Sequence, residues 1–200
     1  MIKMIQKLKN KKGFTLVELI VVIAIIAILT AVIVPLIARY SAQAQYTTLM
    51  DAAQTVSNSA NNAMSDANQI GAVNLTTIDG TKSGGGALSL TCSDSSAGTV
   101  NAAPTNQVYS TSANKRALEK LWESLNTTLP ANCKFHIEIS SSAVAGVIYV
   151  TDTSKTLPAT ASNTVTDVKG FDNAYQLSST DTTAVGVSGS YKPAASTPTT

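Results

Sequence analysis

Residue types that build catalytic and metal sites are scarce in this sequence. Its 200 residues include one histidine, two cysteines and one tryptophan, and only 13% of the residues are charged. The single histidine, His136, lies in a predicted strand with no acid or nucleophile suggested beside it, so a Ser-His-Asp set is not expected. No Cys-x-x-Cys pair, histidine pair or paired-carboxylate motif occurs. We therefore expect a non-enzymatic protein with no catalytic residue, no metal ion and no cofactor.

Positive charge is also scarce once the first thirteen residues are set apart. The whole chain has a formal net charge of +2, but residues 1–13 hold five lysines and no acid. The rest of the chain has nine Lys and Arg against twelve Asp and Glu, which makes its net charge −3. Because no basic patch with interleaved aromatic residues is present, direct binding of nucleic acid is not expected.

Charge is absent altogether from one long stretch, Leu19 to Ala38, in which Thr30 carries the only hydroxyl group. At 1.5 Å per residue, a helix of this length spans roughly 30 Å, the thickness of a hydrocarbon core. Five lysines precede the stretch and only Arg39 follows it closely, so the positive-inside rule predicts a cytoplasmic amino terminus. The sequence therefore predicts a single membrane-spanning helix with most of the chain outside.

The residues just before this stretch form a specific combination. Five lysines precede a glycine and a phenylalanine, and a glutamate follows four residues later, in the run Gly13-Phe14-Thr15-Leu16-Val17-Glu18. A charge costs about 2.5–3.5 kcal/mol at a bilayer centre and less near the interface, so Glu18 invites a functional explanation. The run resembles the class III signal peptide of type IV prepilins. An ordinary anchor or a Sec signal is the alternative, but a Sec cleavage site follows the apolar region.

The resemblance implies how the chain is processed. In the family, a prepilin peptidase cuts after the glycine and methylates the new amino terminus. Cleavage would therefore fall between Gly13 and Phe14, residues 1–13 would be the leader, and Phe14 would be N-methylated. Glu18 matches the assembly residue of the family. Pro35 matches a proline common in pilins, and it predicts a kink or local melting because it removes one i→i−4 hydrogen bond.

Beyond the apolar stretch the pattern becomes that of an amphipathic helix. Apolar residues follow one another at alternating steps of four and three over four heptads, on a helix otherwise rich in small polar residues. They are Ala42, Tyr46, Leu49, Ala53, Val56, Ala60, Ala63, Ala67 and Ile70. We expect one helix over residues 14–70, ended by Gly71, with this stripe packed on a head domain. A free-standing coiled coil is less favoured because the stripe has few large residues.

Residues 71–191 are predicted to form the globular head, and residues 192–200 a disordered tail. Residues 72–111 are rich in Gly, Ser, Thr and Asn and are expected to be a surface connection with little regular structure. The three consecutive glycines at 84–86 are no phosphate loop, because no Gly-Lys-Ser or Gly-Lys-Thr follows. Ser112 is expected to cap a short helix that ends near Leu125 and places Trp122 in the core.

Alternating residues predict strands at 135–139 and 144–150, joined by a turn at 140–142. Weaker strand signals occur at 164–168, 175–177 and 184–187. His136 falls on the polar face of the first strand and is expected to be solvated. A long helix followed by antiparallel strands is an α+β layout, which is similar to the pilin plan of a small sheet packed on a long amino-terminal helix.

The two cysteines, Cys92 and Cys133, both lie in the part of the chain predicted to be outside. An even pair in an oxidising compartment suggests one disulfide. Closing a loop of about 40 residues would stabilise the head by about 4 kcal/mol on the chain-entropy model. Two free, buried thiols are the alternative.

The resemblance implies a structural subunit of a type IV pilus. After cleavage, the single-pass subunit would leave the membrane and polymerise through its amino-terminal helix into an extracellular filament for adhesion or motility. The implied partners are other copies of the chain, the prepilin peptidase, the membrane, and the pilus assembly platform with its ATPase. A pseudopilin of a type II secretion or competence (DNA uptake) system shares the same motif and is the alternative. A membrane-tethered binding protein that never polymerises is a further one.

Overall fold

A single long helix begins the described part of the chain. The computed structural model describes residues 14–105, 108–151, 157, 174–178 and 182–185. Helix α1 spans Leu16–Asn68 and contains Pro35 without interruption, so the local melting considered for this proline does not occur. The chain divides into two compact units, Met1–Tyr40 and Ser41–Thr200.

The second half of α1 buries most of the apolar stripe predicted from the sequence. The stripe residues that are at most 4% exposed are Leu49, Ala53, Val56, Ala60, Ala63 and Ala67. Met64, which is fully buried beside them, was missed because it falls outside the 3.5-residue spacing. Ile70 is 45% exposed and lies beyond the helix, whose last residue, Asn68, accepts a hydrogen bond from the backbone N–H of Val73. The side chain of Ala42 is outside the described residues.

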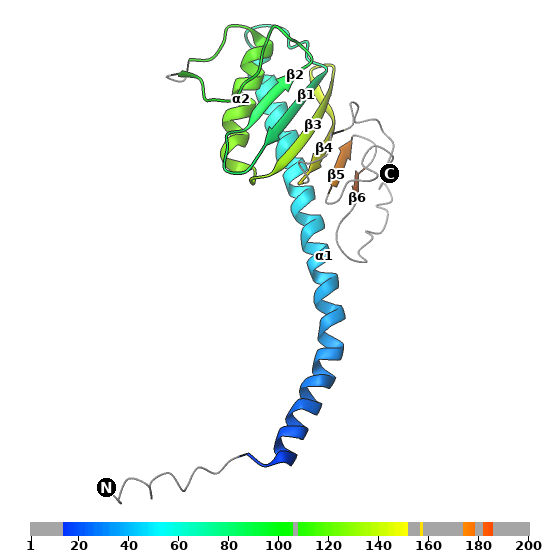
Figure 1. Cartoon of the computed structure of the whole chain (residues 1–200). Coiled ribbons are helices and arrows are strands. Elements are labelled where there is room, and N and C mark those ends of the chain that lie inside the picture. The colour runs from blue at the N-terminus through cyan, green and yellow to red at the C-terminus, as the bar shows by residue number, and fades with distance from the viewer. Residues whose placement is uncertain (1–13, 106–107, 152–156, 158–173, 179–181, 186–200) are drawn as a thin grey trace, which may run out of the picture. The chain divides into compact units, whose positions relative to one another are not determined.

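A six-stranded antiparallel sheet with the strand order β2-β1-β3-β4-β5-β6 packs with the helices in the head (Figure 1). The strands are β1 (Thr77–Lys82), β2 (Ser89–Cys92), β3 (Cys133–Ser140), β4 (Ala143–Val150), β5 (Ala174–Ser178) and β6 (Thr182–Val185). Helix α2 (Ala113–Thr128) lies in the sequence between β2 and β3. Figure 1 shows α2 beside the cyan part of α1, and one hydrophobic cluster joins both helices to strands β1–β4. The α+β prediction is therefore confirmed.

The stretch predicted to be an irregular connection contains strands β1 and β2, so that prediction was wrong. Strand β1 has a single large apolar residue, Ile78, and therefore lacks the alternation that marks a half-buried strand. Its next inward position is Gly80, which pairs with Phe135 of β3. A Cβ atom on Gly80 would lie 2.1 Å from the ring of Phe135, which is fully buried. The glycine thus leaves room for the aromatic ring instead of ending the strand.

Helix α2 confirms the predicted short helix and its buried face. Leu118, Leu121, Trp122 and Leu125 are all buried, as predicted. The indole N–H of Trp122 donates a 2.6 Å hydrogen bond to the backbone carbonyl of Leu88, so the tryptophan joins α2 to the residue that precedes β2. Ser112 occupies the N-cap position, but its side chain makes no cap hydrogen bond. The position of the cap was therefore correct and its chemistry was wrong.

Strands β3 and β4 confirm the predicted hairpin. Ser141 and Ser142 both have positive φ angles, 52° and 59°, as a two-residue type I′ turn requires. Strand β5 confirms the signal at 175–177, whereas β6 overlaps only the first two residues of the signal at 184–187. The signal at 164–168, the leader at 1–13 and the tail at 192–200 lie outside the described residues.

His136 is buried, which contradicts the expectation that it is solvated. It is 2% exposed, and its Nδ1 atom lies 2.7 Å from Oδ1 of Asp79 on β1. Ile148, its register partner on β4, is also fully buried. Strand alternation correctly places His136 opposite to Ile137, but it cannot reveal that both faces are covered at the centre of the sheet.

The expected disulfide between Cys92 and Cys133 is absent, and both thiols are free. Cys92 pairs with Ile78 and Cys133 with Lys82, so the cysteines lie on opposite sides of β1 and near opposite ends of it. Ordinary strand spacings place their Cα atoms about 17 Å apart. A disulfide requires less than about 7 Å. Burial raises the pKa of the Cys133 thiol, which disfavours the reactive thiolate.

Candidate functional site

Glu18 forms a capping box with Thr15 at the start of α1. Glu18 Oε2 accepts hydrogen bonds from the backbone N–H of Thr15 (2.8 Å) and from its hydroxyl (2.9 Å). In return, the backbone N–H of Glu18 donates to the Thr15 hydroxyl oxygen at 3.2 Å. Thr15 is thus the N-cap residue and Glu18 the third residue of the helix, the arrangement of a Thr-x-x-Glu capping box. The carboxylate also lies at the positive end of the helix dipole.

The capping box was missed although the sequence contains its signature, a threonine followed three residues later by a glutamate before an apolar run. From the sequence, Glu18 is expected to be a charge at the start of an apolar run and, by the resemblance, an assembly residue. The structure also gives Glu18 a role within its own chain, where it caps helix α1. The second carboxylate oxygen, Oε1, makes no hydrogen bond to the residues that the structure describes.

The first part of α1 is an apolar surface without a partner in the described chain. Its large apolar side chains, in residues 16–37, are 47–73% exposed. The hydroxyl of Thr30 donates to the backbone carbonyl of Ile26 at 2.7 Å, so the polar group in this stretch is satisfied within the helix. By length and composition, α1 is long and apolar enough to cross a membrane. An exposed apolar surface of this extent marks a membrane or protein contact.

The structure describes Phe14 and Pro35 among the other predicted site residues, but not Gly13. Phe14 precedes α1 and is 92% exposed, whereas Gly13 lies outside the described residues. Pro35 lies inside the continuous helix. Within the described part of the chain, no group of three or more His, Cys, Asp or Glu side chains could hold a metal ion.

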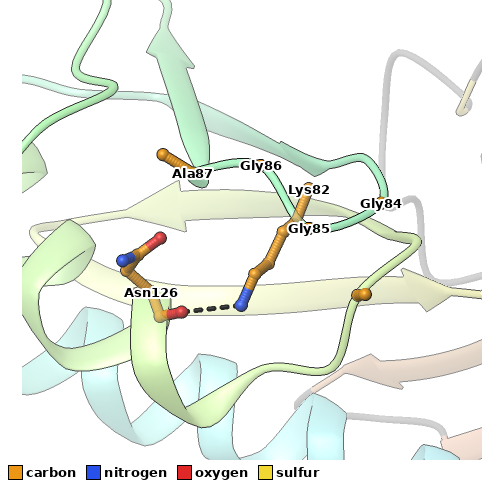
Figure 2. A pocket seen from close by; sticks show the side chains of 7 residues that line it. Lys82, Gly84, Gly85, Gly86, Ala87 and Asn126 are labelled. Carbon is orange, nitrogen blue, oxygen red and sulfur yellow. Dashed lines mark hydrogen bonds between the residues drawn. The ribbon is translucent and has the colours of Figure 1, made fainter.

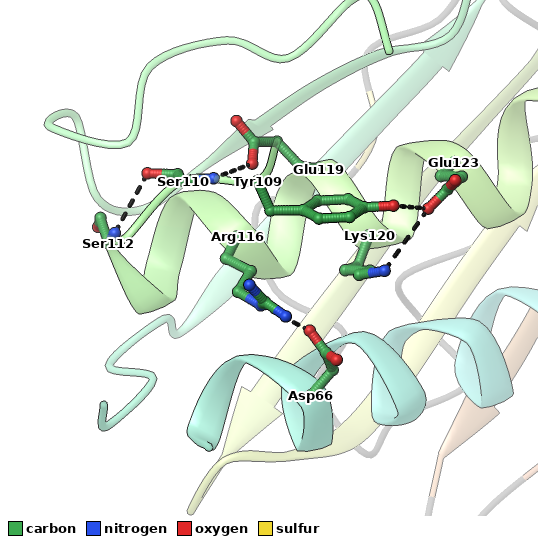
Figure 3. A network of polar contacts seen from close by, with 8 residues as sticks. All are labelled: Asp66, Tyr109, Ser110, Ser112, Arg116, Glu119, Lys120 and Glu123. Carbon is green, nitrogen blue, oxygen red and sulfur yellow. Dashed lines mark hydrogen bonds and ion pairs between the residues drawn. The ribbon is translucent and has the colours of Figure 1, made fainter. Parts of the chain in front are cut away.

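A polar network holds the end of α1, helix α2 and the connection before α2 together (Figure 3). The ring of Tyr109 lies 3.7 Å from the ammonium of Lys120, and the Tyr109 hydroxyl donates to Glu123. Arg116 donates from Nε to Asp66 at 2.7 Å, which joins α2 to α1. This hydrogen bond holds the pKa of Asp66 below its usual value. The network joins these segments, and its charged side chains have partners within the chain.

The three consecutive glycines line a cavity of about 390 Å³ together with Lys82, Asn126 and Ala131 (Figure 2). The ammonium of Lys82 donates to the backbone carbonyls of Asn126 (2.6 Å) and Leu129 (2.7 Å), near the carboxyl end of α2. A cation at this end of a helix satisfies unpaired carbonyls and complements the helix dipole. The lysine beside the glycines therefore stabilises α2.

Lys82→Met is expected to lower the free energy of unfolding of the head by about 2 kcal/mol, because two charge-assisted hydrogen bonds are lost while the apolar stem is retained. Thermal unfolding of the detergent-solubilised protein measures the effect. Lys115→Met is the matched control, since Lys115 is an exposed lysine of α2. Equal melting temperatures for the two variants would contradict the capping role of Lys82.

Comparison with known proteins identifies the amino-terminal segment. Residues 8–34 match the prokaryotic N-terminal methylation motif. No curated protein and no solved structure matches the chain. The matched segment contains Gly13, Phe14, Glu18 and most of the exposed apolar surface. The motif implies processing by a peptidase and assembly at the membrane, and it fits a membrane-anchored precursor. The chain therefore carries, at residues 8–34, the class III signal peptide of type IV pilins and pseudopilins.

Proposed function

We propose that this protein is a structural subunit of a type IV pilus. It is cleaved after Gly13, methylated at Phe14, held in the membrane by the first part of α1, and then polymerised through that helix into a surface filament. The observation that carries this proposal is the exposed apolar surface of residues 16–37 with one carboxylate, Glu18, at its start. Packing against copies of itself replaces lipid with protein around the same side chains.

The Glu18 carboxylate has two functions in this proposal. Oε2 caps its own helix through Thr15, and Oε1 is left for a cation on a neighbouring subunit. Cleavage after Gly13 creates that cation, the amine of Phe14, and methylation keeps its positive charge. Inside a filament, an unpaired carboxylate would lose its water at a cost of several kcal/mol. Pairing between neighbours therefore favours one stagger of two otherwise apolar helices.

Cleavage is expected to require the absence of a side chain at Gly13. A bulky residue there, as in Gly13→Leu, would crowd the peptidase at the bond to be cut, so the full-length precursor is expected to accumulate in the membrane. Intact-mass measurement checks this. The wild-type protein should begin at methylated Phe14, and the variant should retain all thirteen leader residues. An intact leader on assembled wild-type subunits would refute processing at this site.

The proposed function is tested by shearing fibres from the cell surface, imaging them by electron microscopy and identifying their subunits by mass spectrometry. Abundant mature chain in the sheared fibres is the expected result. A chain that is cleaved and membrane-inserted, is absent from surface fibres, and is needed for protein secretion or DNA uptake would instead be a pseudopilin.

A further inference from the structure

The charged residues of α1 differ in whether they have a partner within the subunit. The helix has four of them: Glu18, Arg39, Asp51 and Asp66. Glu18 bonds to Thr15, and Asp66 pairs with Arg116. Arg39 and Asp51 are exposed, have opposite charges, and form no side-chain hydrogen bond or ion pair with the residues that the structure describes. They are also the only charges in α1 between Glu18 and Asp66.

Asp51 lies on the side of α1 that faces away from the head. It is two residues before Ala53, which is fully buried, and two residues correspond to about 200° around a helix. Thr47 and Thr55, each four residues from Asp51, donate their hydroxyl protons to the backbone carbonyls four residues earlier, at 3.0 Å and 2.7 Å. Thr48 does the same at 2.9 Å. The three hydroxyls are therefore satisfied within the helix, and Asp51 carries the one charge on this face.

We propose that Arg39 of one subunit pairs with Asp51 of a neighbouring subunit in the assembled filament. Arg39 and Asp51 are twelve residues apart, about 18 Å along a helix, whereas Glu18 and Phe14 are only four residues apart, so this neighbour is a different one from the subunit whose Phe14 amine pairs with Glu18. The proposal rests on the proposed function, because it requires α1 helices of two copies to pack together. In the single subunit, both charges are exposed and solvated. When helices pack around them they lose water, and an unpaired charge in such a contact is costly whereas a hydrogen-bonded pair is tolerated.

The charges favour a second copy of this chain as the molecule that contacts the Asp51 face of α1. Asp51 belongs to the same helix, α1, as the apolar surface proposed for assembly. A parallel copy of α1 offers Arg39 as its only cation and Asp51 as the only anion between residues 19 and 65. Complementary charges at a contact select the correct partner and register, and like charges in that contact are repelled.

Charge reversal tests the pair in full-length protein expressed in cells that lack the native gene. Arg39→Glu and Asp51→Arg are expected each to lower the yield of sheared fibres by about tenfold or more, because each places like charges in contact. The double variant, with both charges exchanged, is expected to recover to about half of the wild-type yield or better. Lys115→Glu, which reverses an exposed charge on α2, is the matched control and should assemble normally.

Fibre yields are compared at equal membrane levels of cleaved subunit, which excludes defects in insertion or processing. Normal fibres from both single variants would overturn the pair and leave the pilus proposal intact. Loss of fibres in the single variants without recovery in the double variant would show that the two charges act separately, which also overturns it. Absence of fibres from the wild-type protein would overturn the proposed function together with the pair.

Discussion

Glu18→Ala is expected to be cleaved and inserted normally and to reduce the yield of surface fibres by about a hundredfold or more. The reduction is expected because a neighbouring Phe14 amine would then be buried without a counter-charge, at about 3–5 kcal/mol per contact. Electron microscopy and immunoblotting of sheared fibres, at equal membrane levels of mature subunit, measure the effect. Normal fibre yield would show that the carboxylate has no part in assembly.

The capping box makes a second variant necessary. Glu18→Ala removes both the charge and the hydrogen bonds to Thr15, so a loss of fibres could result from fraying of α1. Glu18→Gln separates the two effects, because glutamine also closes a capping box but carries no charge. If pairing with the Phe14 amine matters, Glu18→Gln fails as Glu18→Ala does. If only the cap matters, Glu18→Gln assembles like the wild type.

Gly80→Ala is expected to destabilise the head by about 3 kcal/mol, because the added Cβ atom would lie 2.1 Å from the ring of Phe135. That ring is fully buried and has no open space to move into without disturbing the core. The melting temperature of the head is expected to fall by about 10 °C. Thermal unfolding of the detergent-solubilised protein, followed by circular dichroism, measures the change.

Gly85→Ala is the matched control for this prediction. A Cβ atom on Gly85 meets nothing within 4 Å, and its φ angle is not in the left-handed region. The control variant should therefore melt within about 2 °C of the wild type. Combining Gly80→Ala with Phe135→Leu tests the mechanism, since a smaller side chain at 135 should relieve part of the overlap. An unchanged melting temperature for Gly80→Ala alone would refute the close contact.

The elements predicted correctly are those with a strong repeating pattern. The stripe from Leu49 to Ala67 keeps a helical period, and the strand around Phe135 alternates regularly, so both could be recognised without tertiary information. The amino-terminal motif could also be recognised, because the spacing of Gly13, Phe14 and Glu18 is a local signature, whereas the roles of these residues stay predictions. Local spacing is sufficient where function depends on residues adjacent in the chain.

What could not be predicted depends on contacts between distant segments. The ring of Phe135 fills the space beside Gly80 on the inward side of strand β1. Phe135 lies fifty-five residues after Gly80, and no local pattern encodes that pairing. The burial of His136 depends on the face of the sheet that the alternation assigns to solvent. The disulfide prediction was wrong for the same reason, because an even number of cysteines does not show which strands lie between two thiols.

The order of strands in the sheet has a consequence for how the head folds. Strands β3 and β4 are joined by two residues, so their pairing closes a short loop. Strand β1 cannot pair with β3 until β3 has been synthesised, and β3 follows β1 by about fifty residues, after α2. Loop-closure entropy makes such non-local pairing slow. A chain still being synthesised, with β3 not yet made, leaves the part of the buried α1 stripe that the sheet covers exposed to water, and the small alanines in that stripe limit the apolar surface exposed during this interval.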